Sequence, residues 1–239
     1  MNKSVKPEFD QYAKEYTDLH RASIRTSGED PAYFAAYKAE YMASWLGVDA
    51  RAKSLSILDF GCGVGNTIAH LRKAFPGASL YGADLSGESI RLASESHARE
   101  ATFRTIENAR LPHDDASFDL VMAACVFHHI PPAERAHWMS EIRRVLKPGG
   151  HVFIFEHNML NPLTLKTVRD CPFDEDAILL PRSELLDLTQ HAEFENVRCR
   201  YIVFFPHLLG FLRPLEPVMG WIPFGAQYVV HGIADQVRV

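Results

Sequence analysis

The residues from Ile57 to Asn66 have the types and spacing that bring bare backbone close to a ligand. They read Ile-Leu-Asp-Phe-Gly-Cys-Gly-Val-Gly-Asn, with three alternating glycines after an apolar run. Glycine has no Cβ, so such a turn lets a ligand approach the peptide groups at the start of the following helix. Asp59 disfavours a pyrophosphate at this turn and suits a ligand that carries an amino group. The glycine spacing also differs from the Gly-x-Gly-x-x-Gly of dinucleotide sites.

A second acid, Asp84, follows the glycine turn after about twenty residues, at the end of another apolar run. An acid at this position can accept hydrogen bonds from both hydroxyls of a ribose. Leu85 would then offer an apolar surface to an adenosine. Asp84 could instead cap the following helix, although Ser86 is better placed for that.

Three histidines could act as a general base near neutral pH. His128 and His129 follow an expected strand, and His157 follows Glu156 at the end of the next one. Adjacent residues on an extended segment point in opposite directions, so we expect only one of the first two to face a substrate. Alternatively, both merely pack against or cap the helix that begins at Pro131-Pro132.

Strands that alternate with helices must position these residues. The expected strands are Ser56–Phe60, Ser79–Ala83, Ala101–Thr105, Phe118–Ala124, His151–Phe155, Asn196–Phe205 and Gln227–His231. The expected helices lie within Phe9–Leu46 and at Thr67–Phe75, Glu88–Arg99, Pro132–Val145 and Arg182–Ala192. This alternation predicts parallel pairing through right-handed crossovers, with an antiparallel pair of late strands at one sheet edge. Ligands of such sheets bind beyond the carboxyl ends of the strands, where the winding direction reverses.

The glycine turn resembles motif I of the class I S-adenosylmethionine (SAM) methyltransferases. Asp84, Asn108-Ala109, Phe118–Ile130 and Leu146–Gly150 match further motifs of this family in order and spacing. The resemblance implies an α/β fold, a Rossmann-like doubly wound sheet of seven mostly parallel strands with one antiparallel edge strand. The Phe-Asp-x-Tyr-Ala-x-x-Tyr pattern at Phe9–Tyr16 is similar to the N-terminal helical lid of small-molecule methyltransferases.

The resemblance also implies SAM as the cofactor and assigns residues to it. Asp59 would hold the methionyl amino group, Lys38 or an N-terminal tyrosine the carboxylate, and Asn108 the adenine amino group. The expected cofactor-binding residues are Asp59, Gly61, Cys62, Gly63, Asn66, Asp84, Leu85, Asn108, Ala109, Cys125, Tyr16 and Lys38. The expected catalytic residues are His128, His129 and His157, with a base needed only if the acceptor is protonated.

We expect one domain over residues 1–239, with a lid at 1–50, a SAM-binding core at 51–157 and a substrate-side insertion with the last strand pair at 158–239. The stretch Asn158–Asp176 is expected to be a loop rich in charge and proline. Its acids are Asp170, Asp174, Glu175 and Asp176. They could bind a divalent cation, as in some catechol methyltransferases, but their spacing is not that of a calcium loop. The sequence therefore predicts a solvated loop and no metal site.

Composition limits the partners. A net charge of −5 and a pI near 6.2 argue against a nucleic-acid partner. No apolar run is long enough to cross a bilayer, the N-terminus lacks the apolar region of a signal peptide, and the scattered cysteines are typical of a reducing compartment. We therefore expect a cytoplasmic protein. The apolar segment His207–Phe224 suits a lipophilic acceptor, a membrane-surface contact, a homodimer interface or a packed cover over the sheet.

The sequence thus predicts a SAM-dependent methyltransferase that acts on a small or lipid-like acceptor, with oxygen favoured over nitrogen or carbon. A non-catalytic SAM-binding protein would keep the same motifs and is the main alternative. The glycine spacing disfavours a nucleotide-dependent oxidoreductase. The acidic balance, and the lack of an Asn/Asp-Pro-Pro-Tyr-type stretch after the fourth strand, disfavour a nucleic-acid methyltransferase.

Overall fold

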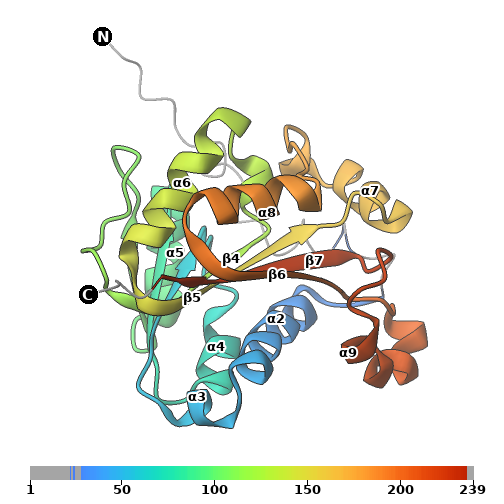
Figure 1. Ribbon diagram of the computed structural model, residues 1–239, viewed down its shortest axis with the longest axis horizontal. Helices are drawn as coiled ribbons and strands as arrows, with labels where there is room; N and C mark the ends of the chain where they lie inside the picture. The colour runs from blue at the N-terminus through green and yellow to red at the C-terminus, as the bar shows by residue number, and fades with distance from the viewer. Residues whose placement is uncertain (1–21, 23, 25–27, 236–239) are drawn as a thin grey trace.

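The computed structural model describes residues 22, 24 and 28–235, and a seven-stranded sheet forms its centre (Figure 1). The strands are β1 (Ser56–Phe60), β2 (Ser79–Asp84), β3 (Ala101–Thr105), β4 (Phe118–Ala124), β5 (Leu146–His157), β6 (Phe194–Ile202) and β7 (Gln227–Ala234). Their order is β3-β2-β1-β4-β5-β7-β6. The first five pair in parallel, while β7 runs antiparallel to both of its neighbours. The expected Rossmann-like fold is confirmed. The reversed strand β7 lies one place in from the edge, because β6 pairs with its outer side.

Helices cover both faces of this sheet. They are α2 (Pro31–Leu46), α3 (Val48–Ala52), α4 (Ile68–Ala74), α5 (Gly87–His97), α6 (Pro132–Val145), α7 (Pro162–Arg169), α8 (Arg182–His191) and α9 (Glu216–Met219). Three 3₁₀ segments join them, η3 (Phe127–His129), η4 (Pro172–Asp174) and η5 (His207–Leu215). In Figure 1, α2, α3 and α4 lie below the sheet, and α6 and α8 lie above it. None of these helices has the length and apolar content needed to cross a bilayer, within the residues that the structure describes.

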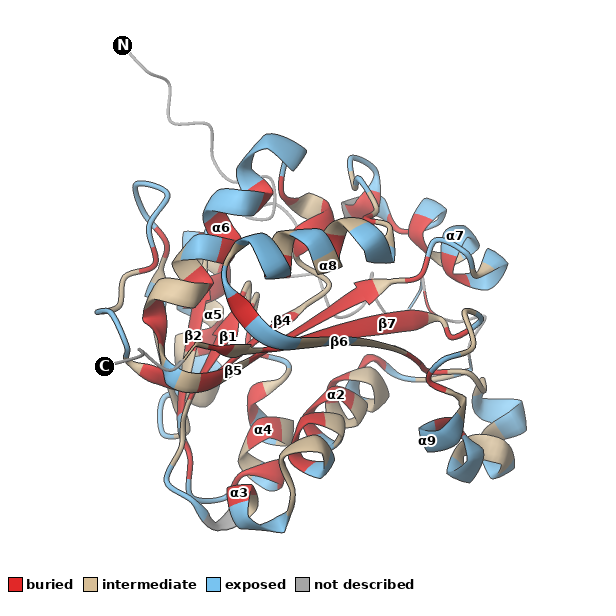
Figure 2. Ribbon diagram, in the orientation of Figure 1, coloured by how far each residue is buried: buried red, intermediate tan, exposed pale blue. Residues whose placement is uncertain are grey.

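The sheet has a hydrophobic core on each of its two faces, because successive side chains along a strand point to opposite faces. On β4, Leu120 and Met122 pack with α2 and α4, whereas Val121 and Ala123 pack with α6 and α8. All four side chains are at most 1% exposed. A strand that is apolar on both faces must be covered on both faces, so the near-continuous apolar run of β4 requires a three-layer fold. Figure 2 shows the buried strands between the two helical layers.

The glycine turn after β1 is fixed by close backbone packing. Gly61 has φ 72° and donates its N–H to the Ala83 carbonyl at 2.8 Å. A Cβ at this position would lie 2.5 Å from a methyl carbon of Val126. The turn therefore joins the ends of β1, β2 and β4, which is the point where the winding direction reverses.

The prediction of a loop over Asn158–Asp176 was wrong for its central residues, because they form the helix α7. The Asn161 side chain accepts hydrogen bonds from the N–H groups of Leu163 and Thr164, and Pro162 takes the first helical position. An Asn cap followed by proline is a helix-start signal that outweighs the charge and proline content of the stretch. Strand β5 also begins earlier than expected, at Leu146, because that residue already pairs with Phe118.

The helix α2 is anchored in the core and also contributes to the cavity described below. The Asp30 side chain caps it, accepting from the Ala32 N–H at 3.0 Å. Met42 and Ala43 are fully buried in the core beside α4. The first half of the helix lies at the cavity, so α2 forms part of its wall. The expected lid segment Phe9–Tyr16 lies outside the described residues.

Candidate functional site

A cavity of about 350 Å³ opens at the carboxyl ends of β1, β2 and β4. Its size lies within the usual range for small-molecule sites. The predicted site residues that line it are Lys38, Asp59, Gly61, Cys62, Gly63, Asn66, Asp84, Leu85, Cys125, His128, His129 and His157. Tyr16 lies outside the described residues. Asp59 and Asp84 thus line one cavity, as the sequence required.

Asp84 fastens the glycine turn to the end of β2. One carboxylate oxygen accepts the Gly63 N–H at 2.8 Å, and the other accepts the Ser86 N–H at 2.8 Å. A carboxylate oxygen can accept more than one hydrogen bond, so Asp84 can also receive ribose hydroxyls. Leu85, which is 53% exposed at the cavity, offers the expected apolar surface.

Asp59 is the most buried acid at the glycine turn. The residue is 1% exposed, and its carboxyl group accepts a hydrogen bond from the Thr67 hydroxyl. Burial raises the pKa of Asp59 to about 7; the Thr67 hydrogen bond and the Lys38 charge lower it, and Asp84 raises it further. A cationic amino group in the cavity would favour the ionised form of this acid.

Lys38 brings a buried cation from α2 to the same cavity. It is 7% exposed, and its Nζ lies 3.9 Å from the sulfur of Cys125. Burial raises the pKa of the Cys125 thiol, so this contact does not neutralise the ammonium group. Lys38 makes no salt bridge within the described part of the chain. It can therefore bind a carboxylate of a ligand.

Glu156, which sequence reasoning did not assign a role, organises the loop after β4. Its carboxylate is fully buried and accepts hydrogen bonds from the N–H groups of Val126 at 3.1 Å and Phe127 at 2.8 Å. It also lies 2.6 Å from Nδ1 of His128. The sequence does contain a signal for this role, which is an acid at the end of an otherwise apolar strand. A buried carboxylate requires hydrogen-bond partners, so such a residue is expected to organise its surroundings.

Asp174 was expected on a solvated loop, and this was wrong. It is 8% exposed, and its Oδ1 lies 3.5 Å from Nε2 of His128 and 3.3 Å from Nε2 of His129. The other acids of the stretch, Asp170, Glu175 and Asp176, are exposed as expected.

Backbone contacts hold the Asp174 segment against the loop after β4. The Ile178 N–H donates to the His128 carbonyl at 2.8 Å. The guanidinium of Arg135, a residue 1% exposed on α6, donates to the Ile178 carbonyl at 2.6 Å and to Glu184 at 2.7 Å. These contacts join segments far apart in the sequence, so the local composition around Asp174 could not predict its burial.

The adjacent histidines both line the cavity, and which of them faces a substrate stays a prediction. His128 and His129 belong to η3, and their ring centroids lie 4.1 Å apart. Residues of a 3₁₀ turn do not alternate between two sides as residues of a strand do. The His157 ring lies 5.0 Å from the His128 ring. All three predicted catalytic histidines therefore occupy one wall of the cavity.

The pKa values of His128 and His157 are shifted in opposite directions. Burial opposes a charge on His128, but Glu156 and Asp174 outweigh it and raise the pKa of His128 to about 10. Burial and the neighbouring His128 lower the pKa of His157 to about 4. At neutral pH, His128 therefore carries a proton on each nitrogen and has no lone pair with which to act as a base.

The structure does not bring Asn108 and Ala109 to the cavity. Both are exposed and adopt positive φ angles of 53° and 50°, at the tip of a turn closed by a bridge between Glu107 and Arg110. The side chain that lines the cavity from this region is Ile106. An adenine contact by Asn108 stays a prediction.

The remaining wall of the cavity is largely apolar and was not predicted residue by residue. It is formed by Phe34, Ile130, Trp138, Leu163, Val203, Phe204 and Phe205, among others. Gln227 of β7 adds a polar group, with its Nε2 3.5 Å from the sulfur of Cys125. Its Oε1 is buried and has no hydrogen-bond partner among the described residues.

Comparison with known proteins agrees with this geometry. Residues 57–150 match a family described as a methyltransferase domain. The chain is 28% identical over 77% of its length to a malonyl-[acyl-carrier protein] O-methyltransferase of Herminiimonas arsenicoxydans, covering 70% of that protein. It is 29% identical over 65% of its length to a 2-methyl-6-phytyl-1,4-hydroquinone methyltransferase of a Synechocystis strain, covering 46% of that protein. The chain thus spans less than half of the second relative.

A solved structure shows a similar fold. It is a SAM-dependent methyltransferase of Thermotoga maritima, described as a possible histamine N-methyltransferase, with a TM-score of 0.64 and 19% identity. The alignment covers 95% of this chain and 98% of that one.

The sheet order, the glycine turn with its two acids and the family match define the class of protein. Together they support a class I SAM-dependent methyltransferase, with SAM as its cofactor.

Proposed function

We propose that this methyltransferase transfers the methyl group of SAM to an oxygen atom of a small, lipophilic acceptor. The observation that carries the proposal is that a single cavity joins two unlike walls. Asp59, Asp84 and Lys38 form a charged wall, and apolar side chains of α2, α6 and the segment after β6 form the other. A sulfonium donor is already a strong electrophile, so such a site mainly has to align the acceptor and exclude water.

The charged wall suits the two ends of SAM. Asp84 would accept the ribose hydroxyls, Asp59 would bind the methionyl ammonium, and Lys38 would bind the methionyl carboxylate. Asp59 and Lys38 are buried at this wall and can carry opposite charges, which supports these roles, because the methionyl group presents one charge of each sign.

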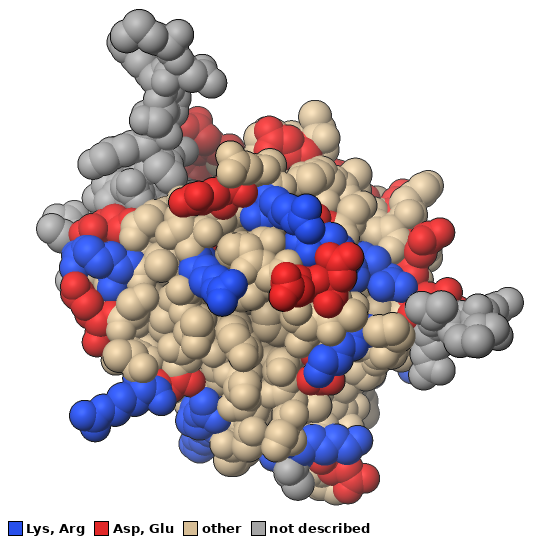
Figure 3. All heavy atoms as spheres, turned by 90° about the vertical axis from the view of Figure 1, so that its left-hand side faces the viewer, with Lys and Arg blue, Asp and Glu red and all other residues tan. Residues whose placement is uncertain are grey.

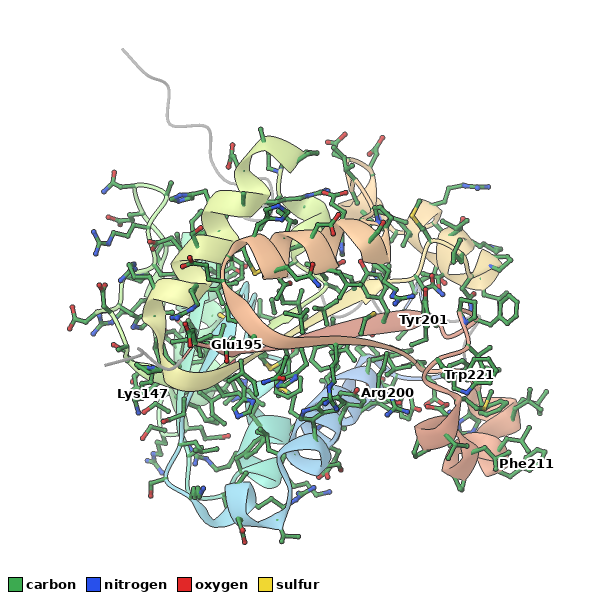
Figure 4. All side chains as sticks on the ribbon, in the orientation of Figure 1. Lys147, Glu195, Arg200, Tyr201, Phe211 and Trp221 are labelled. Carbon is green, nitrogen blue, oxygen red and sulfur yellow. The ribbon has the colours of Figure 1, made fainter. Side chains whose placement is uncertain are left out.

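Exposed apolar side chains near the cavity support a lipophilic acceptor. The apolar flap, defined as His207–Phe224, follows Phe205 and Pro206, which line the cavity. Within it, Phe211 is 75% exposed and Trp221 is 77% exposed, and Figure 4 shows both side chains on this flap at one end of the molecule. Exposed apolar patches of this kind mark surfaces that bind apolar partners. One relative is named for a phytyl-substituted hydroquinone.

The proposal can be tested with two hydroquinone acceptors that differ only in the length of an alkyl chain. We expect methylation of both in the presence of SAM, with a higher kcat/KM for the long-chain acceptor. Phe211→Ser and Trp221→Ser should reduce that preference at least about fivefold and leave the Tm nearly unchanged, because surface substitutions of this kind cost about 0.5 kcal/mol or less. Val48→Ser is the matched control, since Val48 is 81% exposed on α3, outside the flap.

Absence of methylation with tight SAM binding would instead favour a non-catalytic SAM-binding protein. Methylation with no chain-length preference would refute the lipophilic acceptor and leave the enzyme class intact.

Three further expectations stay proposals. A nucleic-acid partner is disfavoured because basic and acidic side chains are interspersed among the described residues of the face in Figure 3. A homodimer through the apolar flap is a competing use of that surface. A cytoplasmic location is supported by the reduced thiols of Cys62, Cys125 and Cys199.

A further inference from the structure

We propose that His128, His157 and Asp174 bind a divalent first-row transition-metal ion at the wall of the cavity, with Glu156 orienting His128. One ligand atom from each of the three residues lies within 4.8 Å of the other two. All three side chains line the cavity that holds the donor site. The three ligands come from separate segments of the chain, so their spacing in the sequence does not predict this group.

The distances favour a metal ion over a direct hydrogen bond between these groups. Nε2 of His128 lies 3.5 Å from Oδ1 of Asp174. A charge-assisted hydrogen bond would be shorter, at about 2.7–2.9 Å. Two ligands of one tetrahedral ion, each bound at about 2.0–2.1 Å, lie about 3.4 Å apart. All ligand-atom separations in the group are at most 4.8 Å, so the site has to contract when the ion binds.

Glu156 supplies the outer partner that metal-binding histidines usually have. Its Oε2 lies 2.6 Å from Nδ1 of His128, so the Nδ1 proton is donated to the carboxylate and Nε2 points toward Asp174. A carboxylate that fixes the tautomer and orientation of a histidine in this way is a common feature of metal sites. Glu156 is therefore a positioning residue.

The charges and the ligand types fit a divalent transition-metal ion. Glu156 and Asp174 place two buried carboxylates beside the imidazoles, which matches the charge of one divalent ion. Two imidazoles and one carboxylate are a ligand set suited to Zn²⁺ or Fe²⁺, and Mg²⁺ prefers oxygen ligands alone. Lys38, the nearby cation, contacts the sulfur of Cys125 and acts electrostatically on Asp59 and on His157.

The ion would give the site a means of holding an acceptor oxygen. Three protein ligands leave at least one coordination position open, and these ligands line the cavity. An oxygen of the acceptor could occupy that position beside the donor. This role depends on the proposed function, whereas the metal binding does not.

Metal binding can be measured without SAM or acceptor. The chain is stripped with a chelator, and Zn²⁺ alone is titrated at pH 7.5 by isothermal titration calorimetry. We expect one ion per chain, with affinity reduced at least about 100-fold in His157→Ala and in Asp174→Asn, since loss of an outer partner alone costs about 10–100-fold. Glu156→Gln should fall within that 10–100-fold range.

His151→Ala is the matched control. His151 and His231 form a close histidine pair outside the cavity, with Nδ1 and Nε2 2.9 Å apart. Its affinity should equal that of the wild type. Thermal melts in metal-free buffer verify that each variant is folded.

The proposal is overturned if no stoichiometric Zn²⁺ binding occurs, or if folded His157→Ala and Asp174→Asn variants bind as tightly as the wild type. A loss of binding in His151→Ala alone would place the ion elsewhere. The open position is tested with the Co²⁺ form, whose visible absorption should change when the oxygen chelator acetohydroxamate is added; an unchanged spectrum would mean a closed site. Binding of S-adenosylhomocysteine to the metal-free chain tests the donor site separately, so the two proposals can fail independently.

Discussion

Binding of S-adenosylhomocysteine should weaken as the pH falls below 7, because its ammonium group requires an ionised Asp59. Burial holds the pKa of this acid at about 7 in the ligand-free protein. If only the ionised form binds, the apparent Kd is multiplied by 1 + 10^(pKa − pH). This factor is about 1.3 at pH 7.5 and about 11 at pH 6.0, so the affinity should fall about eightfold between them.

The assay is isothermal titration calorimetry at several pH values with two controls. Asp59→Asn should bind more weakly at pH 7.5 and lose the eightfold dependence, because an amide cannot ionise. Adenosine, which lacks the amino acid group, should show no such dependence with the wild type. Other groups facing Asp59 are Asp84, Lys38 and Thr67, and they are unchanged in the variant.

The stability of the protein without ligand should also depend on pH through the ionisation of Asp59, and it should decrease as the pH rises. The pKa of Asp59 is raised from 3.8 to about 7, so the folded chain holds this proton more tightly than the unfolded chain. The contribution of Asp59 to stability is therefore lost as the pH rises from about 4 to about 7.

Parallel pH profiles of affinity for the wild type and Asp59→Asn would refute the assignment of Asp59 to the ammonium group.

Two further substitutions test the donor site. Asp84→Ala should weaken S-adenosylhomocysteine binding by about 1–3 kcal/mol in calorimetry, because the ribose hydroxyls lose a charged acceptor; an unchanged Kd would count against the ribose role. Gly61→Ala should lower the free energy of unfolding by about 1–3 kcal/mol in urea titrations, since φ is 72° and its Cβ would lie 2.5 Å from Val126. Gly63→Ala is its control, because no atom lies within 4 Å of that Cβ, and equal losses in the two variants would show that contact with Val126 is not the cause.

Local sequence carried much of the donor half of the site. Three local signals predict this half: the apolar run of β1, the alternating glycines and the acid at the end of β2. Each depends on a short stretch of backbone, so it can be interpreted without the rest of the chain. The bounds of β1, β3, β4 and α6 were predicted without error for the same reason. Asn108 shows the limit of such inference, because the motif predicts an adenine contact whereas Asn108 is exposed and does not line the cavity.

The acceptor half was decided by tertiary structure. Nothing near Asp174 in the sequence distinguishes it from its exposed neighbours Glu175 and Asp176. It is buried against His128 because backbone hydrogen bonds and Arg135 hold the loop after η4 on the end of β4. Glu156 likewise acquires its role from a neighbouring strand.

The amino-acid order alone therefore predicted the class of protein and the turn at which we propose that SAM binds, since a glycine turn between a strand and a helix is a local structure. The grouping of His128, His157 and Asp174 depends on packing between segments far apart in the chain. Contacts of that kind form only when the sheet brings the carboxyl ends of its strands to one edge, and neither composition nor spacing encodes them.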